Sequence, residues 1–258
     1  MMPAVARDLP SRARNKWRRL LVHHAGQRRF DLSTRVPYIS FTFDDYPRSA
    51  LLEGGRILEA HGVRGTYFIS LNLAGGDSPS GTVATPDDVV ATLEAGHEVG
   101  CHTYAHLDGC NSSVAAFETS IADNREAFRR LVPQTPLSVF AYPLDGPVLD
   151  IKRAFGRHFV CCRGGGQTFN AGAIDLNLLN AYFLDWRNQD DLAAVQAVID
   201  QNAAERGWLI FATHDVADSP SRYGVSRRFF NQVVAAAVQS GARVVPMMTA
   251  CRELNISN

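Results

Sequence analysis

Two adjacent carboxylates, Asp44 and Asp45, end an apolar, β-branched and aromatic run, YISFTFDDY, over residues 38–46. Such a run predicts a buried strand that delivers both side chains to its carboxyl end. Because neighbouring carboxylates repel each other, a fold that holds them together usually supplies a cation or raises the pKa of one of them. One carboxylate can then bind a metal while the other takes a proton from water, an arrangement suited to hydrolysis. The sequence leaves a second interpretation open, in which the aspartates cap a helix that starts near Arg48.

The segment GCHTYAHLDG places two histidines, His102 and His106, four residues apart. At this spacing the two imidazoles share one face of a helical turn, so both can reach a single ion. Residues 97–101 are predicted to form a short strand, which ends at His102. A histidine pair at this spacing also occurs as surface decoration. Together with the carboxylates, however, two His and one Asp suit zinc or a similar divalent ion, with an open position for water or substrate.

These motifs resemble those of a known family. FTFDD at residues 41–45 and HTYAH at residues 102–106 are similar to the first two motifs of the polysaccharide deacetylases, carbohydrate esterase family 4, which carry the NodB-homology domain. Three further segments resemble the remaining motifs in their order: FAYPLDG at 140–146, LDW at 184–186 and LIFATH at 209–214. The resemblance extends over roughly residues 36–250, and five ordered motifs rarely agree by chance.

The resemblance implies a metal-dependent N-deacetylase. Carried over by position, it makes Asp44 the general base and makes Asp45, His102 and His106 the ligands of a divalent metal, with Zn²⁺ the expected ion. His214 would be the general acid, since an amine is a poor leaving group until it is protonated and imidazole titrates close to neutral pH. Taken alone, His214 is better interpreted as a core imidazole that is hydrogen-bonded to the backbone.

The third motif departs from the family pattern, which carries an Arg that orients the base and a Tyr after the Pro. Here Tyr142, Pro143 and Leu144 follow Ala141, and neither family residue is present. The segment is still expected to wall the substrate groove, and the backbone N–H of Leu144 could donate to the oxyanion. The missing cation is expected from Arg163, in CCRGGG at the end of a later strand; the alternative is a surface Arg in a Gly-rich loop.

The fourth motif also departs from the pattern. The family usually carries a further Asp several residues before the Trp, where this chain has Tyr182. Only Asp185 is then available to orient Arg163 or His214. Trp186 is expected to line the sugar pocket, because aromatic faces pack against pyranose rings.

Eight predicted strands alternate with helices along the chain. The strands cover residues 38–46, 66–70, 97–101, 138–142, 158–162, 178–185, 209–213 and 243–247, and the helices cover 49–60, 86–95, 113–131, 148–155, 189–204 and 227–239. Strict alternation implies parallel strands, and at 258 residues a barrel is favoured over an open sheet. We therefore predict an α/β fold, a distorted (β/α) barrel with seven or eight parallel strands, in a single domain over residues 31–258. The resemblance implies the same fold, with the candidate residues at the carboxyl ends of the strands.

The composition, with 46% hydrophobic and 20% charged residues, is that of an ordinary globular protein. No apolar run approaches the length of about 18 residues that a membrane span needs, and no secretory signal is expected. Five cysteines without CxxC spacing are expected to be reduced thiols of a cytoplasmic protein. The composition does not indicate an oligomeric state.

Residues 1–30 form a basic N-terminal segment with a local charge of +7, which leaves −7 for the remainder. Nucleic acid is not expected as a partner, because the segment lacks the stacking aromatics of a nucleic-acid groove. Residues 13–22 would present Trp17, Leu20 and Leu21 on one helical face among basic side chains, which predicts peripheral contact with an anionic membrane. A solvated tail, or a short helix that caps the barrel, is the alternative.

Three functions fit the sequence. The first is a hydrolase that removes N-acetyl groups from N-acetylhexosamine residues of a polysaccharide. The expected cytoplasmic location, at the inner face of the membrane, favours an exopolysaccharide or an adhesin precursor such as holdfast over extracellular chitin or cell wall. The second is a non-catalytic carbohydrate-binding protein on the same fold, which the altered third motif permits. The third is a deacetylase or deformylase of a lipid-linked amino sugar.

Overall fold

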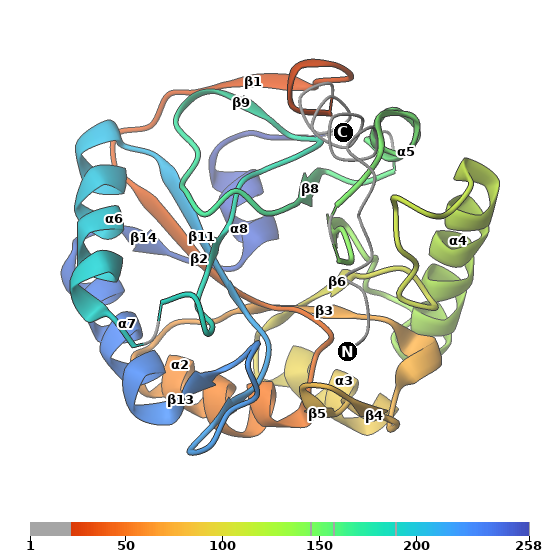
Figure 1. The fold of residues 1–258 in the computed structure, drawn as a ribbon, viewed down its shortest axis with the longest axis horizontal. Coiled ribbons are helices and arrows are strands. Elements are labelled where there is room, and N and C mark those ends of the chain that lie inside the picture. Colours follow the sequence, from red (N-terminus) through yellow and green to blue (C-terminus); the bar gives the residue numbers. More distant parts are fainter. Residues whose placement is uncertain (1–21, 145, 157, 189, 258) are drawn as a thin grey trace, which may run out of the picture.

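The computed structural model describes residues 22–257 except 145, 157 and 189. Its centre is a curled sheet of parallel strands in the order β10, β11, β2, β3, β6, β7, β8, with β14 paired to the start of β2 (Figure 1). The strands are β2 Tyr38–Phe43, β3 Thr66–Ile69, β6 Glu98–Cys101, β7 Val139–Ala141, β8 Cys161–Arg163, β10 Tyr182–Phe183, β11 Trp208–Thr213 and β14 Arg243–Val244. The predicted distorted (β/α) barrel with seven or eight parallel strands is confirmed.

The two ends of this path, β8 and β10, are bridged by irregular chain. Arg163 and Leu179 form an isolated parallel bridge, and the Leu179 N–H donates to the Cys162 carbonyl at 2.8 Å. The chain then runs directly into β10, which pairs with β11. The strand predicted over residues 178–185 is therefore shorter in the structure, where regular pairing is limited to β10.

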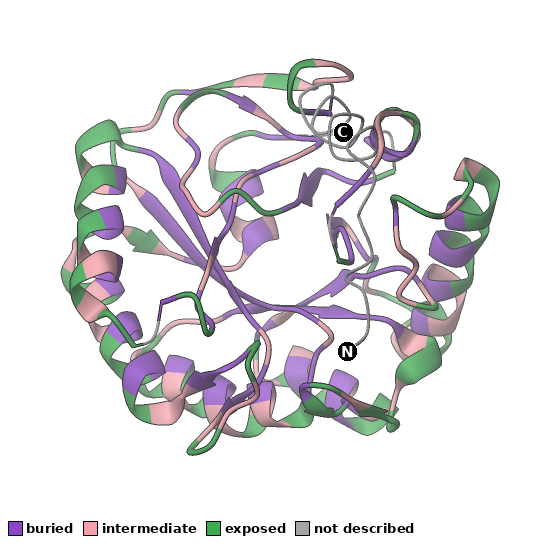
Figure 2. Cartoon of the chain, viewed as in Figure 1, coloured by how far each residue is buried: buried purple, intermediate pink, exposed green. Residues whose placement is uncertain are grey.

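Helices cover the outside of the barrel and turn their buried faces toward the strands (Figures 1 and 2). They are the π-helical η1 Ala50–Gly55, α2 Arg56–Ala60, the 3₁₀ turn η2 Leu71–Leu73, α3 Pro86–Glu94, α4 Val114–Leu131, α5 Leu149–Phe155, α6 Leu192–Glu205, α7 Arg227–Gln239 and α8 Met247–Glu253. Four of them begin at a side chain that accepts a hydrogen bond from the amide three residues on: Thr85, Ser113, Asp191 and Ser226. These caps satisfy amide groups that the helix itself leaves unpaired, so they fix where each helix starts.

Side chains alternate across β2 between two layers of the protein. Phe41 and Phe43 point outward and pack against Phe230 of α7, with ring centroids 5.6 and 5.7 Å away. Ser40 points into the barrel, where its hydroxyl accepts from the indole N–H of Trp208 at 3.0 Å. Because side chains on a strand alternate with a period of two, the inward row that holds Ser40 continues to Asp44. The alternation thus aims Asp44 into the barrel at the carboxyl end of β2.

The opposite, amino-terminal end of the barrel is closed by α8. The strand predicted over residues 243–247 is wrong at its end, because Met247 begins α8. The start of the helix is held by Thr66, whose hydroxyl accepts from the Met247 N–H at 3.0 Å, and by Glu98, whose carboxylate accepts from the Met248 N–H at 2.9 Å. These side chains accept from amide groups that the first turn of α8 leaves unpaired.

Three small antiparallel or parallel pairs lie outside the barrel sheet and were not predicted. They are β1 Arg29–Leu32 with β9 Gly172–Asp175, β4 Asp77–Ser78 with β5 Gly81–Thr82, and β12 Val216–Ala217 with β13 Val225–Ser226. Each strand is only two to four residues long, which is too short to produce a periodic pattern in the sequence. Among the described residues, no helix has the length and hydropathy that a membrane span requires.

Residues 22–37, the described part of the chain before β2, are built into the barrel domain. Lys152 of α5 is buried, donates to the carbonyls of Val22 and Ala25, and pairs with Asp175 of β9 at 2.5 Å. The predicted boundary at residue 30 would cut through β1, so the described part of the predicted basic segment packs with the domain. Residues 1–21, which include the predicted membrane-binding face, lie outside the described residues.

Candidate active site

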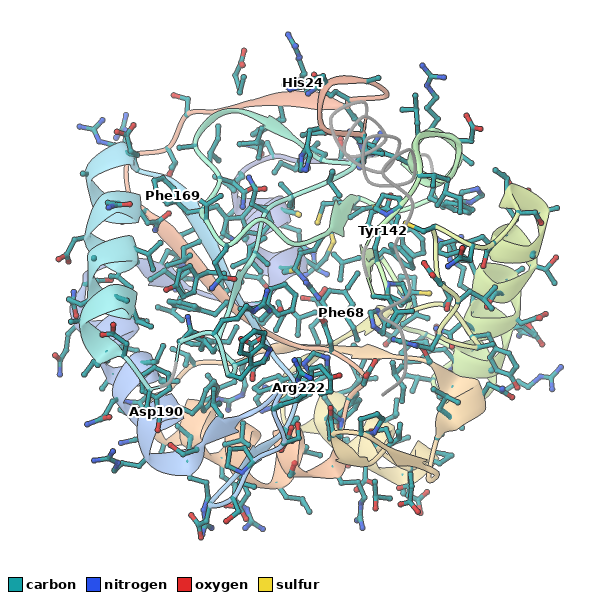
Figure 3. All side chains as sticks on the ribbon, viewed as in Figure 1. His24, Phe68, Tyr142, Phe169, Asp190 and Arg222 are labelled. Atoms are coloured by element: carbon teal, nitrogen blue, oxygen red, sulfur yellow. The ribbon has the colours of Figure 1, made fainter. Side chains whose placement is uncertain are left out.

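Asp44 and Arg163 form a buried ion pair in the mouth of the barrel. The Arg163 Nη2 donates to Asp44 Oδ1, and Nη1 donates to the Gly164 carbonyl at 3.0 Å. The Arg163 side chain is 1% exposed, and its guanidinium lies over the rings of Phe68 at 5.2 Å and Phe183 at 5.5 Å. A charge removed from water in this way is costly unless it is paired, and each of these two groups is the ion-pair partner of the other. Figure 3 shows Phe68 near the middle of the ring of strands.

Asp45, His102 and His106 form a second group beside this pair, hereafter the metal cluster. The Asp45 Oδ1 lies 2.9 Å from His106 Nε2 and 3.4 Å from His102 Nε2. One candidate ligand atom from each residue lies within 4.8 Å of the others. Neither Asp44 nor Asp45 caps the following helix, whose N-cap residue is Ser49.

The prediction that the two histidines share a helical turn is wrong. His102 and His106 belong to the loop that follows β6, and both Thr103 and His106 have the left-handed backbone, with φ of +59° and +52°. Asp45 has it as well, with φ of +55°. Left-handed backbone is unfavourable for residues with a Cβ and persists where the surrounding fold imposes it. The left-handed conformations of Thr103 and His106 turn the loop twice, and these turns, rather than one helical face, bring the two imidazoles together.

The donor set of the metal cluster fits a divalent cation. His102 Nδ1 donates to the Ala141 carbonyl at 2.8 Å, which leaves the Nε2 lone pair facing Asp45. Asp45 Oδ1 is buried, and no hydrogen bond of acceptable geometry reaches it from any described residue. Burial opposes ionisation of Asp45, but contacts with His102 and His106 more than compensate and lower its pKa. A buried, ionised oxygen among imidazole nitrogens is a site for a cation.

His214 reaches the same centre from the end of β11. Its Nε2 lies 3.8 Å from Asp45 Oδ2, and its Nδ1 lies 3.3 Å from the Tyr223 carbonyl. An Nδ1–H donated to that carbonyl leaves Nε2 toward the centre. The backbone also fixes this strand end, because the Asp44 N–H donates to the Thr213 carbonyl at 2.8 Å.

The third motif contributes less side-chain chemistry than the sequence suggests. Tyr142 follows the inward-facing Ala141, so it points outward, where it is buried and donates its hydroxyl to the Asn177 carbonyl at 3.2 Å. The expectation that Tyr142 lines the groove is therefore wrong; it supports β7 from behind. Pro143 is buried, whereas Leu144 is 67% exposed with a left-handed φ of +56° and stands at the rim.

The fourth motif likewise contains a buried polar residue, Asp185, and an exposed residue, Trp186. Asp185 is buried and accepts from the Arg187 amide at 2.9 Å and from the Arg187 guanidinium. The expectation that Asp185 orients Arg163 or His214 is wrong, because its carboxylate is taken up by Arg187 two residues along the chain. Trp186 is 52% exposed beside it and presents its ring at the surface.

Two neighbouring residues at this rim, Arg222 and Tyr223, were not predicted. The Tyr223 ring lies 5.5 Å from the His214 ring, and its carbonyl accepts from His214 as described. The Arg222 guanidinium lies over the rings of both Trp186 and Tyr223. Both residues come from the irregular loop between β12 and β13, where no periodic pattern marks them; the only signal was an aromatic beside a cation.

The sequence is similar to those of known proteins. The profile described as polysaccharide deacetylase matches residues 31–152. A chitin deacetylase from Pestalotiopsis sp is 22% identical over 180 residues, which are 69% of this chain and 53% of that protein. The chain thus spans about half the length of the curated relative that it matches.

Solved structures share the fold. The chitin deacetylase from the fungal pathogen Colletotrichum lindemuthianum superposes with a TM-score of 0.57 and 20% identity, over 84% of this chain and 89% of that one. A mutant of a CE4 family pseudoenzyme superposes with a TM-score of 0.58 and 13% identity, over 85% of this chain and 69% of that one. At these identities the likeness concerns the fold alone.

Proposed function

Because the chain belongs to the polysaccharide deacetylase family, we propose that it is a metal-dependent hydrolase that removes N-acetyl groups from N-acetylhexosamine residues of a polysaccharide. The observation that carries the proposal is the arrangement in the barrel mouth. Three ligand atoms of the metal cluster lie within 4.8 Å of one another, and a separate ion-paired carboxylate and an imidazole lie beside them. A hydrolytic centre needs these three kinds of group.

Asp45, His102 and His106 would hold the cation, for which Zn²⁺ is our choice because two imidazoles and one carboxylate leave a fourth position open. A divalent cation held there would supply Lewis acidity to the scissile carbonyl and to water. The hydrogen bond from His102 to the Ala141 carbonyl fixes the tautomer that such binding requires.

Asp44 is the proposed general base. It is separate from the metal cluster's ligand atoms, and its Oδ1 is occupied by Arg163, so Oδ2 is the oxygen available to take a proton from water. Arg163 is the ion-pair partner of this carboxylate and fixes its orientation, the role that the third-motif Arg plays in the family pattern. The stacked rings of Phe68 and Phe183 hold the guanidinium in place.

His214 is the proposed general acid. Its Nδ1 is committed to the Tyr223 carbonyl, so Nε2 is the atom from which a proton can pass to the leaving amine. The proximity of Nε2 to Asp45 Oδ2, at 3.8 Å, brings this proton to the side of the site where the scissile bond would lie. The backbone N–H of Leu144 at the rim is a candidate donor to the oxyanion.

The experiment that tests the proposal couples metal content to acetate release. We expect zinc-loaded protein to release acetate from N-acetylglucosamine oligomers, and we expect His102→Ala and His106→Ala each to lose both metal and activity, since two ligands hold a cation weakly. His61→Ala is the matched control, because His61 pairs with Asn231 on the outer surface. Full activity after exhaustive chelation would refute the mechanism.

A non-catalytic carbohydrate-binding protein is the second candidate. It is favoured by the altered third motif and by the pseudoenzyme among the proteins that share the fold. Glycan binding measured by calorimetry, together with no acetate release by the zinc-loaded protein from any oligomer, would select it over the hydrolase.

We further propose that the substrate is an exopolysaccharide or adhesin precursor at the cytoplasmic face of the membrane, where the basic N-terminus would hold the protein. Residues 1–21 carry a charge of +5, and each basic residue near an anionic surface contributes about 1 kcal/mol. Sedimentation with anionic vesicles at low salt should disappear when residues 1–21 are deleted, while acetate release persists. Deletion of residues 1–30, in contrast, should unfold the domain, because it removes the Val22 and Ala25 carbonyls that accept hydrogen bonds from buried Lys152. Vesicle binding that survives the shorter deletion would refute this location.

A further inference from the structure

Arg222 stands at the rim of the barrel mouth, held between two aromatic rings. Its guanidinium lies 5.2 Å from the centroid of Trp186 and 5.4 Å from that of Tyr223. The Arg222 carbonyl also accepts a hydrogen bond from the backbone N–H of Trp186 at 3.1 Å. The loop that carries Arg222 and the loop that carries Trp186 are therefore joined by a backbone hydrogen bond as well as by stacking. In Figure 3, Arg222 lies toward the lower edge of the ring of strands, and Asp190 lies farther to the left, nearer α7.

The loop that carries Arg222 is fixed at its base. Asp215, which follows His214, is buried and accepts from the Ser221 amide at 2.7 Å and from the Ser221 hydroxyl at 2.5 Å. The Asp215 carbonyl accepts from the Val225 N–H at 3.0 Å, which closes the loop. Arg222 is therefore presented on an ordered scaffold whose first residue adjoins the proposed general acid.

No carboxylate among the described residues lies within ion-pair distance of Arg222, although acidic side chains line the same pocket as Trp186 and Ser221. Asp185 is paired with Arg187, Asp218 is paired with Arg227, and Asp190 accepts from the Ser226 hydroxyl at 3.1 Å. Each of these acids has its own partner, whereas the guanidinium of Arg222 is exposed and contacts only ring faces. Ring faces leave its in-plane N–H groups free to donate.

The position of Arg222 relative to the scissile bond follows from the ring contacts. The Arg222 guanidinium lies 5.4 Å from the centroid of the Tyr223 ring, and that centroid lies 5.5 Å from the centroid of the His214 ring. A glycan seated with its acetamide at His214 would extend past Arg222 on the same or the adjoining sugar. With a divalent cation bound, the two aspartates and Arg163 leave the centre net positive, so an anion nearby would not be repelled.

Resting on the proposed function, we propose that Arg222 is a specificity-determining residue that binds an anionic group, a carboxylate or a phosphate, carried by the glycan next to the N-acetyl sugar that is hydrolysed. A planar guanidinium with free donors matches either anion through paired hydrogen bonds. The natural substrate would then be an acidic or phosphate-linked glycan, in preference to a neutral homopolymer.

The test compares three N-acetylated substrates of similar length. They are a neutral N-acetylglucosamine oligomer, an oligomer that alternates N-acetylglucosamine with glucuronic acid, and N-acetylglucosamine linked to a pyrophosphate. We expect kcat/KM of the wild-type protein to be about 10-fold higher for one anionic substrate than for the neutral one, the size of one charge-assisted hydrogen bond. Which anionic substrate is preferred distinguishes the carboxylate from the phosphate.

Arg222→Gln should abolish this preference, mainly through KM, and Arg222→Lys should keep part of it. Arg252→Gln, on α8 at the opposite end of the barrel, removes the same charge and should leave the preference unchanged. An equal loss on all three substrates would mean that Arg222 only supports the loop, and the proposal would be wrong. Equal kcat/KM of the wild type on all three would also overturn it.

A binding measurement separates this inference from the proposed function. Calorimetric titration of Asp44→Asn with the same substrates reports affinity without turnover. Weaker anion binding after Arg222→Gln is introduced into this background supports the inference even if the wild type releases no acetate. Unchanged affinity would reject it even if the protein proves to be a deacetylase.

Discussion

The two ends of the barrel treat a buried carboxylate in opposite ways. At the mouth, Asp44 is paired with Arg163 and Asp45 with two imidazoles, and these imidazoles lower the pKa of Asp45 although burial opposes its ionisation. At the closed end, partly buried Glu98 accepts from the Thr66 hydroxyl and the Met248 amide and pairs with no cation among the described residues, and desolvation raises its pKa to about 7. Burial alone thus favours a neutral acid, and a cation is needed to keep a carboxylate ionised for chemistry.

The backbone differs between the two ends as well. Five residues with a Cβ adopt the left-handed conformation around the mouth: Asp45, Tyr46, Thr103, His106 and Leu144. At the closed end, the left-handed described residues with a Cβ are Arg206 and Asn255, which lie where α6 and α8 end, and hydrogen bonds of ordinary geometry hold α8 to β3 and β6. Strain at the mouth is the cost of aiming ligand side chains at one point, and the packed barrel beneath supplies the rigidity that sustains it.

The largest effect on turnover is expected from substitution of Asp44, the carboxylate at the mouth that is not a proposed metal ligand. Asp44→Asn keeps the shape but cannot accept a proton, so we expect acetate release to fall about 10³-fold while metal content stays at the wild-type level. Turnover and metal content measured on the same preparation check this. Asp87→Asn, on α3, is the control for loss of one carboxylate. Metal lost in proportion to activity would show that the roles of Asp44 and Asp45 are reversed.

The next largest effect is expected from substitution of Arg163, the ion-pair partner of Asp44. Arg163→Gln should reduce turnover about 10²-fold and lower the free energy of unfolding by about 3–5 kcal/mol, because it leaves Asp44 buried and unpaired. Arg163→Lys should recover part of both, since it restores the charge but not the planar contacts with Phe68 and Phe183.

Urea unfolding of the double variant Asp44→Asn/Arg163→Gln is the check on this pairing. If the two groups stabilise each other, the double variant should lose less stability than the two single variants together. Additive losses would mean that Arg163 acts independently of Asp44.

The sequence predicts the mouth better where strands are long. β2 and β11 are six-residue strands that are buried along their whole length and rich in aromatic and aliphatic residues, so their ends, and with them Asp44, Asp45 and His214, could be located from the sequence. The helix α7 was predicted with the bounds that the structure has, because its apolar face is regular. Local propensity and burial act in the same direction in these elements.

The conformation of loops and the side-chain pairs within them could not be predicted in this way. The spacing of His102 and His106 suits a helical turn, but the tertiary structure bends it into a left-handed loop. Asp185 was expected to orient the catalytic groups, yet Arg187 is closer along the chain and takes the carboxylate. The aromatic clamp around Arg222 joins two irregular loops, for which neither period nor spacing gives a signal.

The smallest effect is expected at the closed end, and it should depend on pH without touching turnover. A Glu98 pKa of about 7, against an ordinary value of 4.5, means that the folded protein binds this proton more tightly than the unfolded chain does. The stability that follows is fully present below pH 4.5 and is lost as pH rises through 7. Glu98→Gln keeps an acceptor for Thr66 and Met248 but does not titrate. The stability of the wild type relative to the variant should therefore fall between pH 4.5 and 8, by at most about 3 kcal/mol.

Urea unfolding of both proteins across this pH range measures the difference between their free energies of unfolding. The titration of all other groups cancels from this difference. Acetate release by Glu98→Gln should stay within about twofold of the wild type, because the residue lies at the end of β6 away from the metal cluster. Stability curves that run parallel across the range would show that Glu98 is already ionised in the folded protein. The two ends would then hold their carboxylates alike, and the contrast between a charged mouth and a neutral closed end would fail.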